Sequence, residues 1–233
     1  MKRILLIAFV LLFLTPKTYA VRPFVTKDAT IGHRLWQLET WALFDKYSAQ
    51  HWNMLTYGVS DEFEVSAGLV WGKSNSTFAT PLIETKYLFR EYQAGKSAGV
   101  AIAAGAFLPT GKDNFIVPGN GAYSLLAITA CLGENENIFV HANIGATYLN
   151  VENRNSFAAI WRLGAQVKVF EDLHFVGEIL AGGPFVPGTG VACHAGFKYS
   201  ISERIQIDAS IGQGNKTPLW AGFGARFVIK CKS

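Results

Sequence analysis

The sequence predicts an all-β fold: a closed antiparallel transmembrane β-barrel of about twelve strands, of the outer-membrane type. Three observations predict it. Segments of about ten alternating residues recur from His33 onward without a helix-period segment between them. Tight polar turns alternate with longer loops, and an export signal precedes the first strand. A soluble β-sandwich accounts for the alternation but not for the other two features.

The hairpin from Glu62 to Tyr92 shows the two-faced pattern most clearly. In its first arm Phe63, Val65 and Leu69 share one face, and the other face carries Glu62 and Glu64. The second arm alternates in the same way. In a membrane barrel the apolar face meets lipid and the charged face lines the interior.

The same unit repeats along the whole chain, with each strand about ten residues long, which suits a tilted membrane strand. The predicted starts are Leu35, Gln50, Glu62, Leu82, Ala98, Ala122, Ile138, Ala158, Leu173, Val191, Arg204 and Leu219. An even number of strands places both chain ends at the same rim, which the short turns identify as periplasmic. Aromatic residues near the strand ends, among them Phe139, Trp41 and Trp52, are predicted to form two girdles.

The first residues predict export. Lys2 and Arg3 precede an apolar run that is too short for a membrane anchor, and small residues end at Ala20. We therefore expect a signal peptide over residues 1–20 and a single barrel domain over 21–233, with 21–33 as a periplasmic N-terminal segment. The predicted location is the outer membrane of a Gram-negative bacterium.

The net charge excludes one class of partner. Removing Lys2, Arg3 and Lys17 from the 21 basic residues leaves 18 against 17 acidic residues, so the mature chain is almost neutral. No basic patch remains for a nucleic acid. The three cysteines are odd in number and far apart, which does not indicate a disulfide framework.

Phasing each strand by its apolar face predicts which polar side chains line the lumen and any solute pathway through it. They are Glu39, Glu62, Glu64, Glu84, Lys86, Arg90, His141, Asn143, Arg162, Lys168, Glu178, Lys198 and Arg226, together with Gln166, His194 and Asp208. Two interpretations stay open: a hydrogen-bonded plug that closes a narrow barrel, or a solute pathway. We also predict that Glu62 or Glu64 pairs with Arg90, because a charge in a confined interior needs a partner.

The sequence predicts no catalytic residues, metal or cofactor. His141 and Asn143 are the nearest approach to a hydrolase site, but no serine is placed beside them. The five histidines show no paired spacing, and there is no Cys-x-x-Cys.

Several stretches occur in the order and spacing of one family. They are residues 22–30, residues 57–64, Lys86-Tyr87, residues 108–111, residues 143–145 and Gly177-Glu178. In these the chain resembles the outer-membrane barrels named for the MetA pathway of phenol degradation, often labelled as transporters. The resemblance covers nearly all of the mature chain and implies a closed barrel that passes small, hydrophobic or aromatic compounds. The chain departs from the family's usual pattern at Lys27-Asp28, where an acidic pair is common.

The predicted function is a porin-like channel or transporter for small, largely uncharged solutes, working as a monomer whose partners are outer-membrane lipid and the solute. The loop from Pro109 to Gly121 is longer than two adjacent strands require, and we expect it to shape the outer entrance. The alternative is a structural or adhesive barrel with a closed lumen; an outer-membrane hydrolase ranks below both.

Overall fold

The chain folds into a closed twelve-stranded antiparallel barrel, as the alternation predicts. The computed structural model describes residues 24, 26–30, 32, 34–73, 77–108, 120–133, 135–151, 154–182, 190–216 and 218–230. The predicted signal peptide and residues 109–119 of the predicted entrance loop lie outside this part of the chain.

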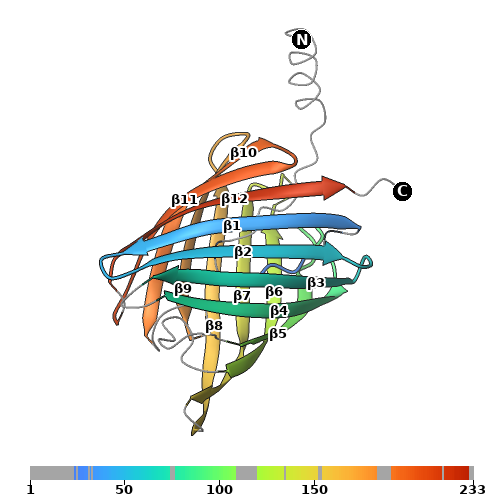
Figure 1. The fold of residues 1–233 in the computed structure, drawn as a ribbon. Helices are drawn as coiled ribbons and strands as arrows, with labels where there is room; N and C mark the ends of the chain where they lie inside the picture. The colour runs from blue at the N-terminus through green and yellow to red at the C-terminus, as the bar shows by residue number, and fades with distance from the viewer. Residues whose placement is uncertain are drawn as a thin grey trace, which may run out of the picture.

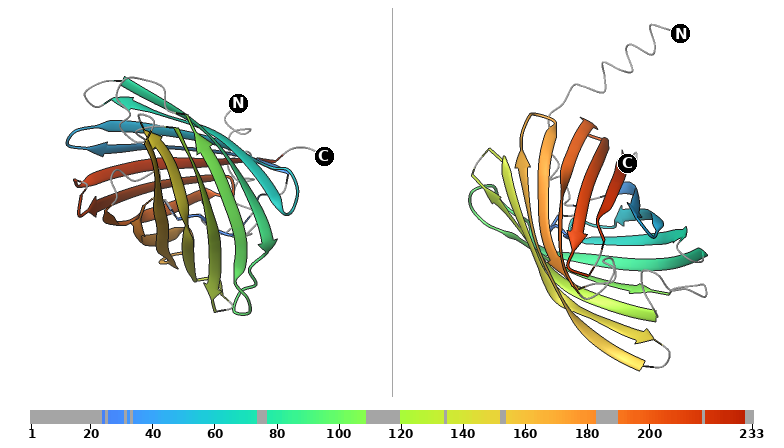
Figure 2. Two further views of the ribbon diagram at one scale, coloured as in Figure 1. Left: turned by 90° about the horizontal axis from the view of Figure 1, so that it is seen from below. Right: turned by 90° about the vertical axis from the view of Figure 1, so that its left-hand side faces the viewer.

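Every strand pairs with its neighbours in sequence, and the first strand pairs with the last. The strands are β1 (Leu35–Asp45), β2 (Ala49–Gly58), β3 (Phe63–Lys73), β4 (Thr77–Arg90), β5 (Gly99–Phe107), β6 (Asn120–Leu132), β7 (Ile138–Val151), β8 (Arg154–Lys168), β9 (Leu173–Ala181), β10 (Val191–Ser202), β11 (Ile205–Gly214) and β12 (Trp220–Lys230). Figure 1 shows β1 and β12 side by side, and the two views of Figure 2 show strands around the whole circumference.

Barrel closure fixes the positions of the two strand ends. Leu35 pairs with Lys230 and Asp45 with Trp220, so β1 begins and β12 ends at one rim, here called the termini rim. The connections at this rim have two to five residues, except for the eight between β4 and β5. The opposite rim, here called the far rim, carries short turns as well as the longest connections, after β5 and after β9. The predicted contrast between the rims therefore holds only for those longer links.

The predicted strand starts lie within about three residues of the observed ones, except at β4 and β8. β4 begins at Thr77, five residues before the predicted Leu82, and continues through Pro81. The Pro81 carbonyl accepts a hydrogen bond from Leu108 N, just past the end of the β4–β5 ladder, so the missing N–H of Pro81 also points to the β5 side. Proline therefore removes no hydrogen bond from the β3–β4 ladder.

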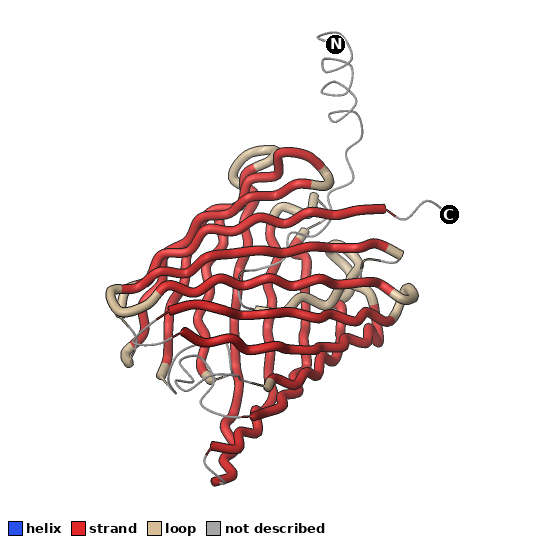
Figure 3. Tube along the Cα trace, viewed as in Figure 1, coloured by secondary structure: helices blue, strands red, loops and turns tan. Residues whose placement is uncertain are grey.

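The outward face is apolar, as expected for a barrel wall in lipid. Leu69 is 40% exposed, Ile83 59%, Ile144 65% and Phe223 59%, although each lies within a strand. Figure 3 shows strands and loops alone in the described chain, and no helix there is long and apolar enough to cross a membrane.

Candidate solute pathway in the barrel lumen

The inward-facing positions hold most of the polar side chains that the alternation predicts. Those that are at least nine-tenths buried within the barrel are Glu39, Glu64, Glu84, Lys86, His141, Asn143, Arg162, Glu178 and Lys198, together with Gln166 and His194. Lys168, Asp208 and Arg226 also lie at inward positions and are partly exposed. The structure thus brings opposite charges from many strands into one interior.

Two predicted lumen residues lie elsewhere. Glu62 precedes β3, is exposed, and its carboxylate accepts a hydrogen bond of 3.2 Å from the outward-facing Tyr87 hydroxyl. Arg90 follows a register shift in β4 after Leu88, is exposed, and donates from Nε to the Ala98 carbonyl at 2.8 Å. The irregular register breaks the alternation on which the prediction depended.

The predicted pairing of Glu62 or Glu64 with Arg90 is therefore wrong. Glu64 instead accepts from Lys86 Nζ at 2.9 Å, within the lumen. These two residues face each other directly in the β3–β4 ladder, whereas Arg90 lies beyond the paired part of that hairpin. The rule that a confined charge finds a partner holds, but the partner was misassigned.

A segment that precedes the first strand crosses the lumen. Residues 24, 26–30 and 32, here called the N-terminal strap, lie inside the barrel, and Thr26, Lys27, Asp28 and Ala29 are all at most 4% exposed. For these described residues, this corrects the expectation that 21–33 form a periplasmic segment. Phasing of strands could not find the strap, because it follows no strand period. The adjacent opposite charges of Lys27 and Asp28 were the available signal.

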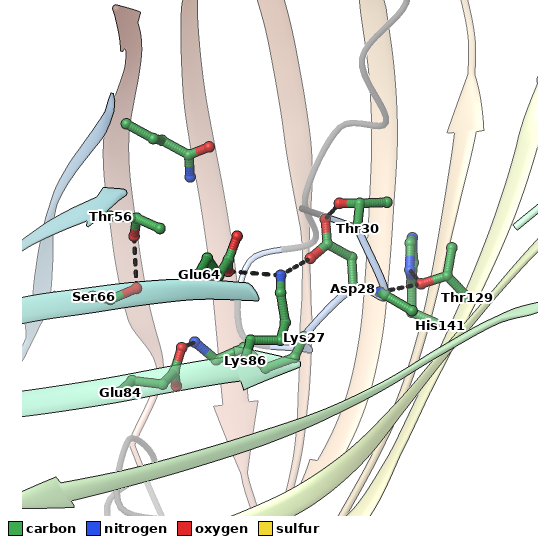
Figure 4. A network of polar contacts seen from close by, with 12 residues as sticks. Lys27, Asp28, Thr30, Thr56, Glu64, Ser66, Glu84, Lys86, Thr129 and His141 are labelled. Carbon is green, nitrogen blue, oxygen red and sulfur yellow. Dashed lines mark hydrogen bonds and ion pairs between the residues drawn. The ribbon is translucent and has the colours of Figure 1, made fainter. Parts of the chain in front are cut away.

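The strap charges pair with the lumen wall. Lys27 Nζ donates to Glu84 Oε1 at 2.5 Å. Lys86 Nζ lies 3.1 Å from Asp28 Oδ1 and 2.9 Å from Glu64 Oε1, so one ammonium bridges two carboxylates (Figure 4). The Tyr123 hydroxyl also donates to Glu84. Each of these charges is withdrawn from water and partnered, which is the condition for keeping it ionised in a protein interior.

Side chains of the wall also satisfy the strap backbone. Thr26 N donates to Glu178 Oε1 at 2.9 Å. Asn143 accepts from Lys27 N at 2.7 Å and donates to the Lys27 carbonyl at 2.8 Å, as a neighbouring strand would. Ala29 N donates to Thr129 Oγ1 at 2.8 Å. A chain without strand neighbours is thereby paired inside the barrel.

His141 belongs to this network. Its Nδ1 lies 3.0 Å from Thr129 Oγ1, the same hydroxyl that binds the strap, and its side chain is fully buried (Figure 4). Asn143, which the sequence places near His141, is occupied by Lys27. The pair therefore holds the strap rather than forming a catalytic arrangement. In the described part of the chain, no three His, Cys, Asp or Glu side chains gather as metal ligands.

Ala29 of the strap lies close to the backbone at Gly99. A Cβ there would lie 2.9 Å from Tyr92 N and 3.1 Å from the Ala29 carbonyl oxygen, so a side chain would push the strap away. Tyr92, at the termini rim, packs edge-on against Phe139 at 5.6 Å. Burial and the neighbouring Glu136 carboxylate raise the pKa of Tyr92 well above its usual range, so this phenol stays protonated.

Towards the far rim, part of the lumen is apolar. The buried inward-facing side chains there include Trp52, Val70, Leu82, Phe107, Tyr123 and Leu125. Trp41 stacks on Trp52 with ring centroids 5.4 Å apart.

Three aromatic residues predicted to lie in the girdles face the interior instead. They are Trp41 and Trp52 and, near the termini rim, Phe139, which is 4% exposed. Their assignment to aromatic girdles is therefore wrong. Position near a strand end does not decide which face a side chain takes.

The two sides of the lumen differ in packing. The inward-facing residues of β2–β9 are here called the strap wall. Most of them are buried under the strap or the apolar cluster, although Gly145 and Lys168, for example, stay partly exposed. The inward-facing residues of β10, β11, β12 and β1, here called the small-residue wall, include several that stay partly exposed. These are Gln37, Ser200, Asp208, Ser210, Gly224 and Arg226.

Comparison with known proteins agrees with this architecture. The family model described as "Putative MetA-pathway of phenol degradation" matches residues 27–228. An outer membrane channel from Pseudomonas putida F1 is 9% identical, with 92% of this chain and 100% of that chain covered and a TM-score of 0.60. A KdgM porin is 7% identical, with coverages of 82% and 98% and a TM-score of 0.63. No curated protein matches the sequence.

Proposed function

Because the chain belongs to the family described by the MetA pathway of phenol degradation, we propose that it is an outer-membrane channel for small, largely uncharged solutes. The barrel spans the outer membrane as a monomer, with lipid around its apolar outward face. Solutes with an aromatic or other apolar body suit the lumen best. The family description and the exposed apolar outward face support this proposal.

The charge balance of the lumen favours neutral solutes. Its described cations, strap included, are Lys27, Lys86, Arg162, Lys168, Lys198 and Arg226, and its anions are Asp28, Glu39, Glu64, Glu84, Glu178 and Asp208, six of each sign. A lumen of one sign concentrates solutes of the opposite charge. Equal numbers of charges of the two signs give no such preference, whereas the apolar cluster at the far rim favours apolar groups.

The observation that carries the proposal is the partial exposure of the small-residue wall. A barrel with a purely structural role gains stability by burying its interior, as most of the strap wall does. Here one side of the interior keeps polar and small side chains accessible. The second candidate, a structural barrel with a closed lumen, is favoured by the packing of the strap wall alone.

Liposome swelling separates the two candidates. Purified protein is reconstituted, and uptake of a neutral aryl glucoside is compared with uptake of a neutral disaccharide and of an aryl disulfonate. Liposomes with heat-denatured protein serve as the control. A channel of the proposed kind admits the aryl glucoside fastest and the disulfonate slowest. Equal swelling with native and denatured protein, for all three solutes, contradicts the channel and supports the structural barrel.

A further inference from the structure

We infer that the solute pathway runs along the small-residue wall, with Asp208 and Arg226 as the polar groups that select what passes. This inference rests on the proposed channel function. It adds a route and two specificity-determining residues. Three features of the wall support it: the size of its side chains, the way they lie, and the chemistry along its length.

The centre of this wall is built from residues with little or no side chain. Gly196 of β10 lies opposite Ser210 of β11, and Ser210 lies opposite Gly222 of β12. Three neighbouring strands thus present glycine or serine at the same height. On the strap wall Asn143 and Glu84 reach the strap. On β10 the inward neighbours of Gly196 reach it too: the His194 ring centroid lies 4.8 Å from that of Phe24, and Lys198 Nζ lies 4.9 Å from the Phe24 ring. Small residues leave room that larger ones would fill.

Two of the larger side chains of the small-residue wall, those of Asp208 and Leu43, lie against its glycines. A Cβ on Gly224 would be 2.7 Å from the Asp208 carboxylate oxygens, so this carboxylate rests over the glycine. A Cβ on Gly222 would be 2.7 Å from Leu43 Cδ2 and 2.8 Å from Ser210 Oγ. The two glycines therefore leave space at the wall that the Asp208, Leu43 and Ser210 side chains occupy.

The chemistry changes along the wall. Trp41, Leu43 and Trp220 lie towards the far rim and are partly buried against the apolar clusters. Towards the termini rim come Asp208 and Arg226, and Arg226 Nη2 donates to Gln37 Oε1 at 2.6 Å. Gln37 in turn donates to Glu39 at 2.8 Å. An apolar surface followed by hydrogen-bonding groups of both signs suits a neutral solute with an aromatic body and a hydroxyl group.

Substituted-cysteine labelling tests the route. Cys131, Cys193 and Cys231 are first replaced with alanine. In this background Ser210→Cys places a thiol on the small-residue wall, and Ser66→Cys places one on the strap wall. Ser66 is the matched control, because it is also an inward-facing serine but is 5% exposed and bonded to Thr56 Oγ1 at 2.8 Å. Both substitutions change oxygen to sulfur alone, so both proteins should fold.

The folded proteins are treated with a charged methanethiosulfonate, and labelling and planar-bilayer conductance are followed together. We expect Ser210→Cys to react about tenfold faster than Ser66→Cys, because thiol modification requires access, and to lose most of its conductance. Equal labelling, or full labelling at position 210 without loss of conductance, overturns the route. A cysteine-free parent that does not conduct contradicts the proposed function instead, while the labelling ratio still decides which wall is accessible.

A second pair of variants tests the route without a reagent. Ser210→Phe adds a ring to the small-residue wall, and Ala209→Phe adds the same ring one residue earlier on the same strand, facing outward. We expect severalfold slower uptake of the aryl glucoside for Ser210→Phe and unchanged uptake for Ala209→Phe. Unchanged uptake for both variants overturns the route. Asp208→Asn should increase anion permeation relative to cation permeation, and an unchanged ratio overturns the role of Asp208.

Discussion

The strap wall and the small-residue wall share one sequence pattern but have different interiors. Both alternate outward apolar and inward polar residues. On the strap wall, Lys86, Glu84 and Asn143 meet Lys27 and Asp28 of the strap and are buried. On the small-residue wall Phe24 of the strap packs against His194 and Lys198, and several other inward side chains stay partly exposed. Alternation decides which residues face inward, and the strap decides which become a packed interior.

The ion pairs of the strap wall give the largest expected effect. Lys86→Ala removes the ammonium that bridges the buried Asp28 and Glu64 carboxylates. Removing one partner of a buried ion pair costs about 3 to 5 kcal/mol. The urea midpoint of heat-modifiable gel migration in detergent should fall accordingly. Lys46→Ala, in a turn at the far rim, is the control and should change little. Equal midpoints for the two variants would mean that the strap is not held as described.

The stacked Trp41 and Trp52 allow the packing of the two walls to be compared with the same substitution. Trp52, on the strap wall, is 3% exposed, whereas its partner Trp41 belongs to the small-residue wall and is partly exposed. Trp52→Ala should cost about 3 to 5 kcal/mol, as for other fully buried aromatic residues. Trp41→Ala removes less buried surface and should cost clearly less in the same assay. A larger cost for Trp41 would contradict the difference in packing between the walls.

On the outward face, the cost of an arginine substitution should depend on its depth in the membrane and not on which wall carries it. Leu69→Arg, in the middle of β3, should cost about 2 to 4 kcal/mol, because it places a cation in the hydrocarbon region. Leu219→Arg, just before β12 at the far rim, should cost about 0 to 1 kcal/mol. Refolding into lipid vesicles measures both. Similar costs would argue against the assignment of this face to lipid.

The smallest effect is expected at Arg90. Its guanidinium is exposed and bonds to the Ala98 carbonyl, so Arg90→Ala should change the free energy of unfolding by no more than about 0.5 kcal/mol. Lys86→Ala measured alongside provides the contrast. If Arg90→Ala were as destabilising as Lys86→Ala, the partner of Glu64 would need to be reassigned.

Strand alternation was enough to predict the fold and most of the lumen. The period of two is set by the backbone itself, so Glu84, Arg162 and Glu178 were placed inward from sequence alone. It failed where local geometry departs from the period. The register shift after Leu88 moved Arg90 out of the lumen. Pro81 led the prediction to begin β4 five residues too late.

The strap could not be predicted by the same reasoning. Its residues belong to no strand, and its partners Glu84, Asn143, Thr129 and Glu178 lie 57 to 152 residues away along the chain. Such contacts depend on barrel closure, which brings distant strands around one interior. The apolar cluster was missed for a related reason: Trp52 and Leu82 alternate correctly, but an apolar inward side chain is unusual in a polar-lined barrel.

The most direct test of the account is a disulfide between the strap and the wall. A Cβ on Gly164 would lie 3.5 Å from the Thr26 Cβ, at the short end of the range that a disulfide needs. In the cysteine-free background, Thr26→Cys with Gly164→Cys should cross-link nearly completely on mild oxidation of the folded barrel. Thr26→Cys with Ala165→Cys, whose second site faces outward, should not. Two free, reactive thiols in the first pair would contradict a strap bound inside the lumen.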